Sequence, residues 1–244
     1  MSTTSPGRSA RRSAVHILLL ATMTSGCSGL RGGRPGDRGE AVLFRDELAL
    51  HAPSRCLPDG EHVGAWEVRF TGYGCVSVRL ERRGASLQLA PRIAHGASAT
   101  HAALVLGPSV QAPMTVEARA RTDRQLREGA DPNAWEVGWL VWHYLDDEHF
   151  YYLIPKPNGW ELGKRDPAYP GGQRFLATGE QPATALGRWT RLRVRAFADG
   201  RMRVYVNATL VAELVDDERP YRSGRIGVYV EDAVARFRDI VVRR

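Results

Sequence analysis

From residue 41 onward the chain alternates apolar and polar residues, and a helical repeat of apolar positions is almost absent. Successive side chains of a β-strand point to opposite faces, so short alternating runs predict half-buried strands. Gly, Pro, Asn and Asp interrupt the runs at turn positions. The pattern predicts strands at residues 41–48, 65–71, 75–82, 85–91, 101–106, 114–121, 135–144, 149–155, 173–178, 188–197, 201–206, 209–215, 224–230 and 234–242.

These strands follow one another mostly about ten residues apart, which is typical of two packed antiparallel sheets. The Asp199-Gly200 and Asn207-Ala208 pairs are hairpin turn signals between apolar runs. We therefore predict an all-β fold, a two-sheet antiparallel sandwich at 41–244. The longest polar interruption, residues 122–134, is expected to be either a functional loop or a mobile surface loop.

The first 26 residues have the pattern of a secretory signal peptide. Arg8, Arg11 and Arg12 precede a short apolar run at 14–23, too short to span a bilayer. Residues 27–40 are rich in Gly, Arg and Pro and predict a flexible tether. The domain organisation is then a signal peptide at 1–26, a tether at 27–40 and the sandwich.

The sequence Thr24-Ser25-Gly26-Cys27 resembles a bacterial lipobox, in which the cysteine is acylated, although Thr24 replaces the usual Leu. The resemblance implies an exported lipoprotein at the cell surface or in the periplasm, held to the membrane by its lipid anchor only. Ordinary secretion is the alternative. With Cys27 lipidated, Cys56 and Cys75 are left as an even pair, for which export predicts a disulfide rather than two free thiols.

The net charge adds little to this picture. It is +7, of which three charges belong to the signal-peptide arginines, leaving +4 for the rest of the chain. The basic residues are dispersed, so the composition gives no support for a nucleic-acid partner.

Aromatic residues and the two lysines concentrate in residues 135–164. Four of the six tryptophans lie there, and so do Lys156 and Lys164, against 32 arginines in the chain. Aromatic rings stack on the C–H faces of sugars while polar groups bond the hydroxyls. We expect a saccharide site here, and the alternative is a buried hairpin. The candidate binding residues are Trp135, Trp139, Asn158, Trp160, Glu161 and Lys164.

Alternation within 135–144 places Trp135, Trp139 and His143 on one face. We expect this face to line the groove, where His143 would serve as a base with Tyr151 or Lys156 assisting. A core histidine bonded to a backbone carbonyl is the alternative. For the polar residues near the turn, a surface ion pair between Glu161 and Lys164 is the alternative to a binding role.

Four segments resemble the concanavalin A-like (laminin-G-like) jelly-roll superfamily, and in particular its 3-keto-disaccharide hydrolase or 3-keto-glucoside lyase domain family. They are LFRDEL at 43–48, VGWLVWHYLDDEHFYYLIP at 137–155, 187–214, and GRIGVYVEDAVARFRDIVV at 224–242. The resemblance implies a jelly-roll sandwich and a sugar partner, and leaves catalysis open. Related jelly rolls hold a calcium between the first and last strands, which implies Asp46 and Asp239 as metal ligands.

The likeness to two enzyme groups is fainter. Family 16 glycoside hydrolases carry paired carboxylates on one strand, whereas Glu136, Glu161 and Glu231 lie on different strands. Jelly-roll polysaccharide lyases use Gln-Ile-His and Arg-rich strands, which residues 141–143 and 124–127 match only in part. The sequence therefore predicts a glycan-binding or oligosaccharide-binding domain. The alternatives are a carbohydrate lyase or glycoside hydrolase, and a cell-envelope module that binds protein.

Overall fold

The computed structural model describes residues 40–51, 55–82 and 84–244. These residues form sixteen strands and two short 3₁₀ helices, Leu48–Leu50 and Pro170–Gly172, so the predicted all-β class is confirmed. The strands are β1 Val42–Arg45, β2 His62–Val63, β3 Trp66–Phe70, β4 Cys75–Glu81, β5 Gly84–Ala90, β6 Ala102–Gln111, β7 Met114–Gln125, β8 Gly138–Asp146, β9 His149–Lys156, β10 Gly159–Arg165, β11 Gln173–Gly179, β12 Thr190–Ala196, β13 Arg201–Val206, β14 Thr209–Val215, β15 Ser223–Glu231 and β16 Ala233–Arg243.

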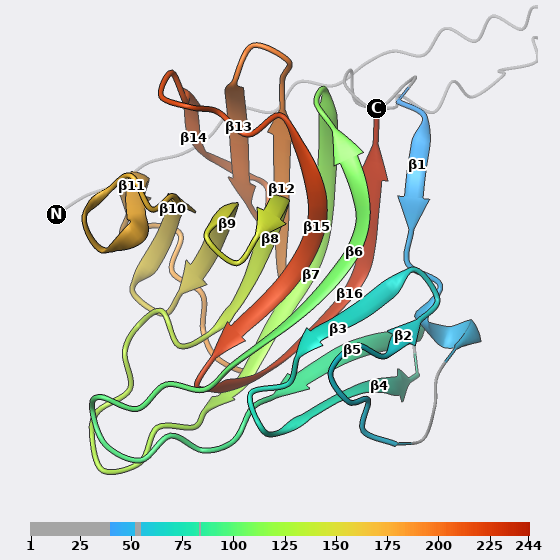
Figure 1. The fold of residues 1–244 in the computed structure, drawn as a ribbon, viewed down its shortest axis with the longest axis vertical. Helices are drawn as coiled ribbons and strands as arrows, with labels where there is room; N and C mark the ends of the chain where they lie inside the picture. Colours follow the sequence, from blue (N-terminus) through green and yellow to red (C-terminus); the bar gives the residue numbers. More distant parts are fainter. Residues whose placement is uncertain (1–39, 52–54, 83) are drawn as a thin grey trace, which may run out of the picture. The chain divides into compact units, whose positions relative to one another are not determined.

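Two antiparallel sheets form the predicted sandwich (Figure 1). Sheet A has the order β14-β13-β12-β7-β16-β5-β4, and β1 pairs with β16. Sheet B has the order β11-β10-β9-β8-β15-β6-β3-β2. Within the described residues, no helix is long and apolar enough to cross a membrane.

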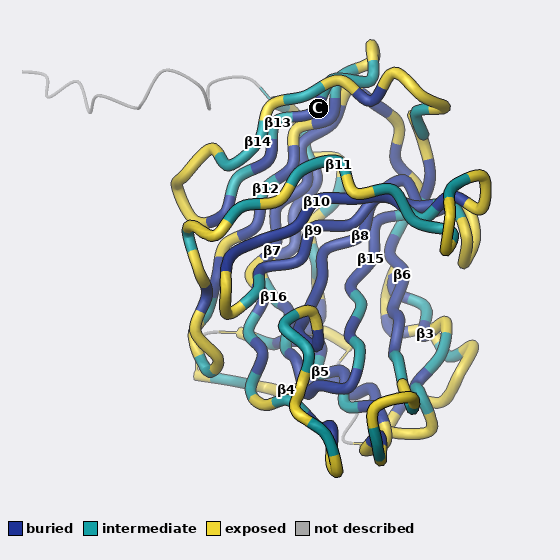
Figure 2. Tube along the Cα trace, turned by 90° about the vertical axis from the view of Figure 1, so that its left-hand side faces the viewer, coloured by how far each residue is buried: buried dark blue, intermediate teal, exposed yellow. Residues whose placement is uncertain are grey.

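Sheet B carries an apolar cluster on each of its two faces. The main core contains side chains of both sheets, including Leu140 and Trp142 of β8 and Phe237 of β16. A second apolar cluster is built only from sheet B and its flanks, and it contains Trp139 and Val141 of the same strand β8. Because alternate residues of a strand point to opposite faces, the second cluster lies on the face of sheet B turned away from sheet A. The central strands of sheet B are buried along their length (Figure 2).

Strand boundaries differ from the sequence prediction in a few places. Strand β7 runs to Gln125, into the predicted loop, and β6 continues to Gln111. The short β2 was not predicted. A strand without stated bounds was expected after the turn at Asn158-Gly159, and β10 lies there. Residues 1–39, which carry the predicted signal peptide, most of the tether and Cys27, lie outside the described residues.

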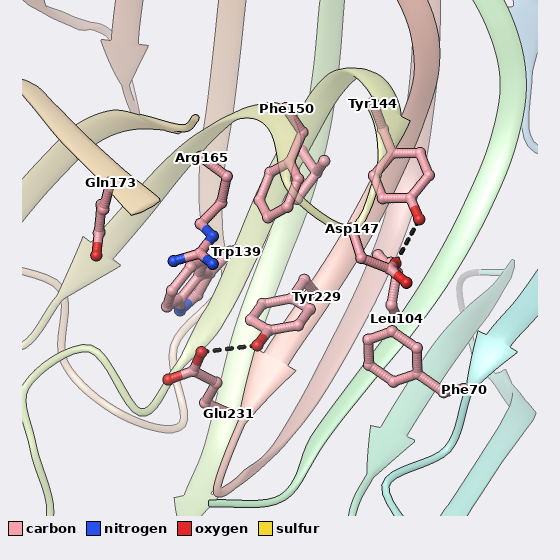
Figure 3. A pocket seen from close by; sticks show the side chains of 11 residues that line it. Phe70, Leu104, Trp139, Tyr144, Asp147, Phe150, Arg165, Gln173, Tyr229 and Glu231 are labelled. Carbon is pink, nitrogen blue, oxygen red and sulfur yellow. Dashed lines mark hydrogen bonds between the residues drawn. The ribbon is translucent and has the colours of Figure 1, made fainter. Parts of the chain in front are cut away.

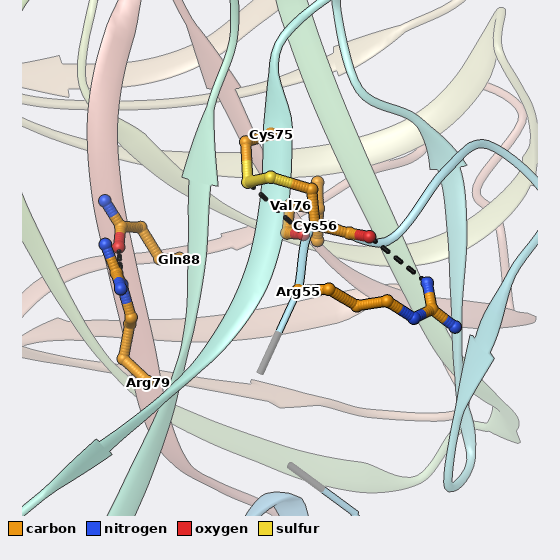
Figure 4. The surroundings of a disulfide bond; sticks show 6 residues. All are labelled: Arg55, Cys56, Cys75, Val76, Arg79 and Gln88. Carbon is orange, nitrogen blue, oxygen red and sulfur yellow. Dashed lines mark hydrogen bonds between the residues drawn. A yellow bond between two sulfur atoms is a disulfide. The ribbon is translucent and has the colours of Figure 1, made fainter. Parts of the chain in front are cut away.

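The predicted disulfide is confirmed: Cys56 and Cys75 are bonded, with 5.2 Å between their Cα atoms (Figure 4). The bond joins the segment before β2 to the first residue of β4. Leu57 next to it pairs with Val76 and is buried. The bond therefore attaches the chain before β2 to the edge strand of sheet A.

Replacing Cys56 and Cys75 together by alanine is expected to lower the free energy of unfolding by about 3 kcal/mol, because the bond closes a loop of about 20 residues in the unfolded chain. Urea unfolding of both forms, with and without reductant, measures the loss. Reductant should destabilise the wild type and leave the double variant unchanged. Equal stability of the two oxidised proteins would contradict the expectation.

Candidate functional site

A hollow beside the aromatic cluster lies on the outer face of sheet B (Figure 3). Its volume is about 300 Å³, at the lower end of the range for small-molecule sites, about 300–1,000 Å³. Seven strands of sheet B (β3, β6, β8, β9, β10, β11 and β15) and the β8–β9 turn supply its walls. We call it the aromatic pocket; its lining residues are Phe70, Leu104, Trp139, Val141, Tyr144, Asp147, Phe150, Arg165, Gln173, Tyr229 and Glu231.

Aromatic rings in contact with one another form the floor of this pocket. The Trp139 ring centroid lies 4.8 Å from that of Tyr229 and 5.2 Å from that of Tyr152. Tyr144 stacks on Phe150 at 5.8 Å. Such ring-to-ring contacts hold each side chain in one orientation. The floor is therefore rigid before any ligand arrives.

Polar groups reach into the pocket from two sides. Glu231 accepts a hydrogen bond of 2.7 Å from the Tyr229 hydroxyl. The Tyr144 hydroxyl donates to Asp147 at 2.5 Å, and Asp147 also accepts from Arg69 at 3.2 Å. In Figure 3, Glu231 and Asp147 lie on different sides of the floor. The pocket thus offers two separate carboxylates.

Arg165 and Gln173 complete the polar wall beside Glu231. They lie on the neighbouring strands β10 and β11, whose residues Arg165 and Gln173 are paired in the ladder. The Gln173 amide donates to the Tyr152 hydroxyl, and the Arg165 guanidinium donates to the carbonyl of Gly171 at 3.1 Å. Both side chains are half-buried and keep donors that these bonds do not use.

Burial changes the acidity of the carboxyl and hydroxyl groups in this pocket. Desolvation raises the pKa of Glu231, and the nearby carboxylates of Asp232 and Glu136 raise it further, against the opposing effects of Tyr229 and Arg165. Burial also raises the pKa of Tyr229 well above its usual value, and that of Tyr144 to about 12. The two phenols therefore remain hydrogen-bond donors at neutral pH, and Glu231 holds its proton to a higher pH than an exposed glutamate.

A bulge in β8 places His143 away from this pocket. The ladder between β8 and β9 shifts register between Trp142 and Asp146, and His143 has a positive φ of 47°. Trp139 and Val141 line the pocket, as alternation predicts for their face, but after the bulge Tyr144 takes the place expected of His143. One residue out of phase exchanges the two faces of a strand.

His143 is instead buried beside Tyr151 and Tyr221. Its Nδ1 lies 2.8 Å from the carbonyl oxygen of Tyr221, and since a carbonyl only accepts, Nδ1 carries the proton. Its Nε2 has no hydrogen-bond partner among the residues that the structure describes. Burial lowers the pKa of His143 to about 4. The histidine is neutral at pH 7 and matches the core alternative.

Tyr151 and Lys164 meet in a buried cluster around Asp216. The Tyr151 hydroxyl donates to Asp216 at 2.5 Å, and the Lys164 ammonium donates to the same carboxylate at 2.7 Å. Lys164, which is fully buried, also donates to the carbonyls of Glu218 and Arg219. These bonds fasten the β14–β15 loop to sheet B and occupy both functional groups.

The other predicted site residues are dispersed. Lys156 pairs with Glu161 at 3.0 Å, and Lys164 pairs with Asp216, so the alternative of a Glu161–Lys164 ion pair is not what the structure has. Trp160 is 5% exposed, belongs to the main core and donates to the carbonyl of Gln181. Asn158 is exposed in the β9–β10 turn. Trp135 is 44% exposed and supports the pocket through its carbonyl, which accepts from the Trp139 indole at 2.8 Å.

The predicted metal ligands, Asp46 and Asp239, each contact other groups of the protein. Asp46 uses one carboxylate oxygen to accept the N–H of Ile240, and Asp239 pairs with the Arg119 guanidinium at 3.2 Å. Residues 40–51, 55–82 and 84–244 contain no group of three or more carboxylate, histidine or cysteine side chains placed to hold a metal. Calcium takes six to eight oxygens, which the two carboxylates alone do not supply, so the calcium site stays a prediction.

Arg127, in the segment that partly matches the lyase motif, is a structural residue. It is buried and pairs with Glu136 and Asp232 at 2.7 Å each, and it also donates to the carbonyls of Gly96 and Ala99. These bonds fasten the polar segment after β7 to the end of β15. The guanidinium is fully engaged and lies outside the aromatic pocket.

Sequence reasoning missed most of the polar pocket residues. Tyr229 and Glu231 alternate on β15, the neighbour of β8 in sheet B. The one available signal was this alternation in GRIGVYVED, but only the strand order shows that it adjoins Trp139. Arg165 and Gln173 come together for the same reason, across β10 and β11.

Comparison with known proteins supports the resemblance seen in the sequence. Residues 125–243 match the family model of the 3-keto-alpha-glucoside-1,2-lyase-like domain. This region contains the strands from β8 to β16 and nine of the eleven residues that line the aromatic pocket. The other two, Phe70 and Leu104, lie on β3 and β6. No curated protein sequence matches the chain.

Solved structures with the same fold cover most of the chain at low identity. A carbohydrate-binding module CBM66 from Bacillus subtilis aligns with a TM-score of 0.53 and 16% identity over 74% of this chain and 96% of its own. A protein of unknown function with galectin-like fold, also from Bacillus subtilis, gives 0.54 and 15% over 83% and 96%. The catalytic domain of PdAgaC gives 0.53 and 10% over 91% and 97%. These likenesses confirm the jelly-roll fold.

Acidification is expected to destabilise the protein through His143. Its pKa is about 4 when folded and 6.5 when unfolded, so between these values the unfolded chain binds the proton first. Stability from this residue is complete above pH 6.5 and falls as the pH drops towards 4, by about 3 kcal/mol in total. Urea unfolding of the wild type and His143→Asn from pH 4 to 8 measures the difference. Asparagine is chosen because it tolerates the positive φ and does not titrate. If the stability of both proteins falls in parallel with pH, His143 is not the cause of the loss.

Proposed function

We propose that this chain is an exported, lipid-anchored domain that binds a saccharide in the aromatic pocket. One observation carries the proposal. A single hollow has both a floor of packed aromatic rings and polar side chains with hydrogen-bonding groups that their protein contacts do not use. Trp139 and Tyr229 offer ring faces for sugar C–H groups, while Arg165, Gln173 and Glu231 offer donors and acceptors for hydroxyls.

The pocket size favours a short saccharide or the end of a longer chain. About 300 Å³ suits a compact ligand rather than a long polymer lying along the whole sheet. The matched family is named for 3-keto-alpha-glucosides, which makes a glucose-derived saccharide the first class to test. The Arg165 guanidinium and the remaining N–H of the Gln173 amide would serve keto and hydroxyl oxygens as donors.

A sugar-active enzyme is the second candidate, and the raised pKa of Glu231 favours it. In a 3-keto-glucoside the carbonyl acidifies the C2–H bond. A carboxylate can take that proton while the electron pair forms the C1–C2 double bond and the C1–O bond breaks, with the leaving oxygen protonated. General acid–base groups work best with a pKa near the operating pH. Among the pocket residues, Glu231 is placed for this role, whereas His143, Tyr151 and Lys156 do not line the pocket.

The export part of the proposal rests on residues 1–40. The apolar run at 14–23, the TSGC sequence ending at Cys27 and the polar segment after it support a lipid anchor. The disulfide agrees with an oxidising compartment outside the cytosol.

Arg165→Ala is expected to weaken saccharide binding about tenfold or more, because hydrogen bonds to a charged group contribute about 1.5–3 kcal/mol. Calorimetric titration with glucose, 3-keto-glucose and their disaccharides measures the affinity. Arg203→Ala is the matched control, since Arg203 is a half-exposed residue of sheet A paired with Glu213. Equal affinities for wild type and Arg165→Ala would count against the pocket.

Glu231→Gln separates binding from catalysis. The amide keeps the shape and still accepts the Tyr229 hydroxyl, but it no longer takes a proton. If the chain is an enzyme, turnover of 3-keto-glucosides, followed by product release, should fall at least a hundredfold with affinity changed by less than tenfold. If the wild type binds these sugars without turnover, the enzyme candidate is wrong and the binding function stands.

Cys27→Ala is expected to move the protein from the membrane fraction to the soluble fraction, because the acylated thiol is its proposed membrane attachment. Fractionation of cells that express either form, followed by immunoblotting, measures the change. Cys56→Ala with Cys75→Ala is the control, since it removes two cysteines and leaves the anchor. Identical fractionation of Cys27→Ala and wild type would overturn the lipoprotein assignment.

A further inference from the structure

A second hollow of about 370 Å³ adjoins the aromatic pocket at the β3–β4 turn. The two hollows share one wall, the side chain of Phe70 at the end of β3. Phe70 pairs with Leu104 of β6, which lines the first hollow, and Ala102 of the same strand lines the second. The other residues of the second hollow are Asp59, Thr71, Gly72, Tyr73, Thr100 and His101.

Tyr73 presents its ring to solvent at the rim of this second hollow. The residue is 79% exposed and has a positive φ of 61°. Bulky side chains rarely adopt this backbone region, which is strained for them. An exposed aromatic residue in a strained conformation contributes little to the core. Its position points to a role in contact with something outside the chain.

The turn that carries Tyr73 is fixed by its surroundings. A Cβ on Gly72 would lie 2.3 Å from the carbonyl oxygen of Ala102, and one on Gly74 would lie 2.1 Å from that of Ala90, so both positions require glycine. The N–H of Thr71 donates to Asp59 at 2.8 Å. The backbone of the turn is therefore held in one conformation, which lowers the entropy lost when a ligand binds at this turn.

Polar groups flank the Tyr73 ring. The His101 ring meets it edge-on at 5.7 Å, and the Arg92 guanidinium lies 5.5 Å from its centroid. The Nδ1 of His101 lies 3.0 Å from the carbonyl oxygen of Arg92 and carries the proton of that bond. The Nε2 of His101 takes no part in that bond. The second hollow, like the first, thus places a guanidinium and other polar groups beside an aromatic ring.

We propose that this second hollow, which we call the Tyr73 subsite, binds a further sugar unit of the ligand held in the aromatic pocket. The ligand is then an oligosaccharide that passes over Phe70, with one part on Trp139 and Tyr229 and another stacked on Tyr73. This inference rests on the saccharide-binding function proposed above and adds the length of the ligand to it. A second aromatic ring adds a second stacking contact, so a ligand long enough to reach it should bind more tightly.

The experiment measures how affinity depends on the length of the saccharide and on the side chain at position 73. Affinities of wild type, Tyr73→Ala, Tyr73→Phe and Arg165→Ala are measured by calorimetry for glucose and for α- and β-linked gluco-oligosaccharides of two to six units. The wild type should bind the longer sugars about tenfold or more tightly than glucose. Tyr73→Ala should remove this gain and leave glucose binding unchanged, Tyr73→Phe should keep it, and Arg165→Ala should weaken every member. Thermal unfolding shows that the variants fold.

The two proposals fail in different ways. If the wild type binds glucose and longer sugars equally, or Tyr73→Ala weakens both to the same extent, the Tyr73 subsite is wrong while saccharide binding stands. If Tyr73→Ala retains the full gain with length, the subsite is also wrong. A wild type that binds no member of the series overturns the saccharide function and the subsite together. Leu80→Ala, an exposed position on sheet A, is the control for loss of exposed apolar surface and should match the wild type.

Discussion

Strand β8 is buried on both faces from Gly138 to Tyr144, and the arrangement of the site depends on this constraint. One face of sheet B packs on sheet A, as in any sandwich. The other face carries its own apolar cluster of aromatic side chains, which sheet A does not cover. These rings cover one another instead, and they leave a hollow where Trp139, Tyr229 and Phe150 meet. The pocket is thus a place where this second apolar cluster is not fully packed.

The charged groups of this protein fall into two kinds: those that hold the fold together and those that are available at the pocket. Buried charges are costly unless they are paired and hydrogen-bonded. Lys164 with Asp216, and Arg127 with Glu136 and Asp232, meet that requirement with several bonds each. Glu231 instead accepts a neutral phenol, and its pKa rises. The difference separates ion pairs that hold loops from a carboxyl group that remains available to a ligand.

The sequence pattern predicted the strands and the sandwich because alternation depends on each strand alone. It predicted the pocket face of β8 through Trp139, but not the position of His143, since one residue at positive φ shifts the phase of all that follow. Aromatic richness did not separate Trp160, which is core, from Trp139, which lines the pocket. The rare lysines were also ambiguous: Lys164 fills a buried ion pair. Glu231 joins the site through strand pairing, which no local pattern contains.

The two hollows differ in how their aromatic rings are held, and this difference bears on recognition. Trp139 and Tyr229 stand on paired strands and are fixed by neighbouring rings. Tyr73 stands on a turn whose backbone two glycines fix, and its exposed ring is flanked by His101 and Arg92. Both devices order the site before binding, so little conformational entropy is lost when a ligand stacks. Sugars offer only weak contacts per unit, and a chain that binds them gains most by having its contact surfaces already in position.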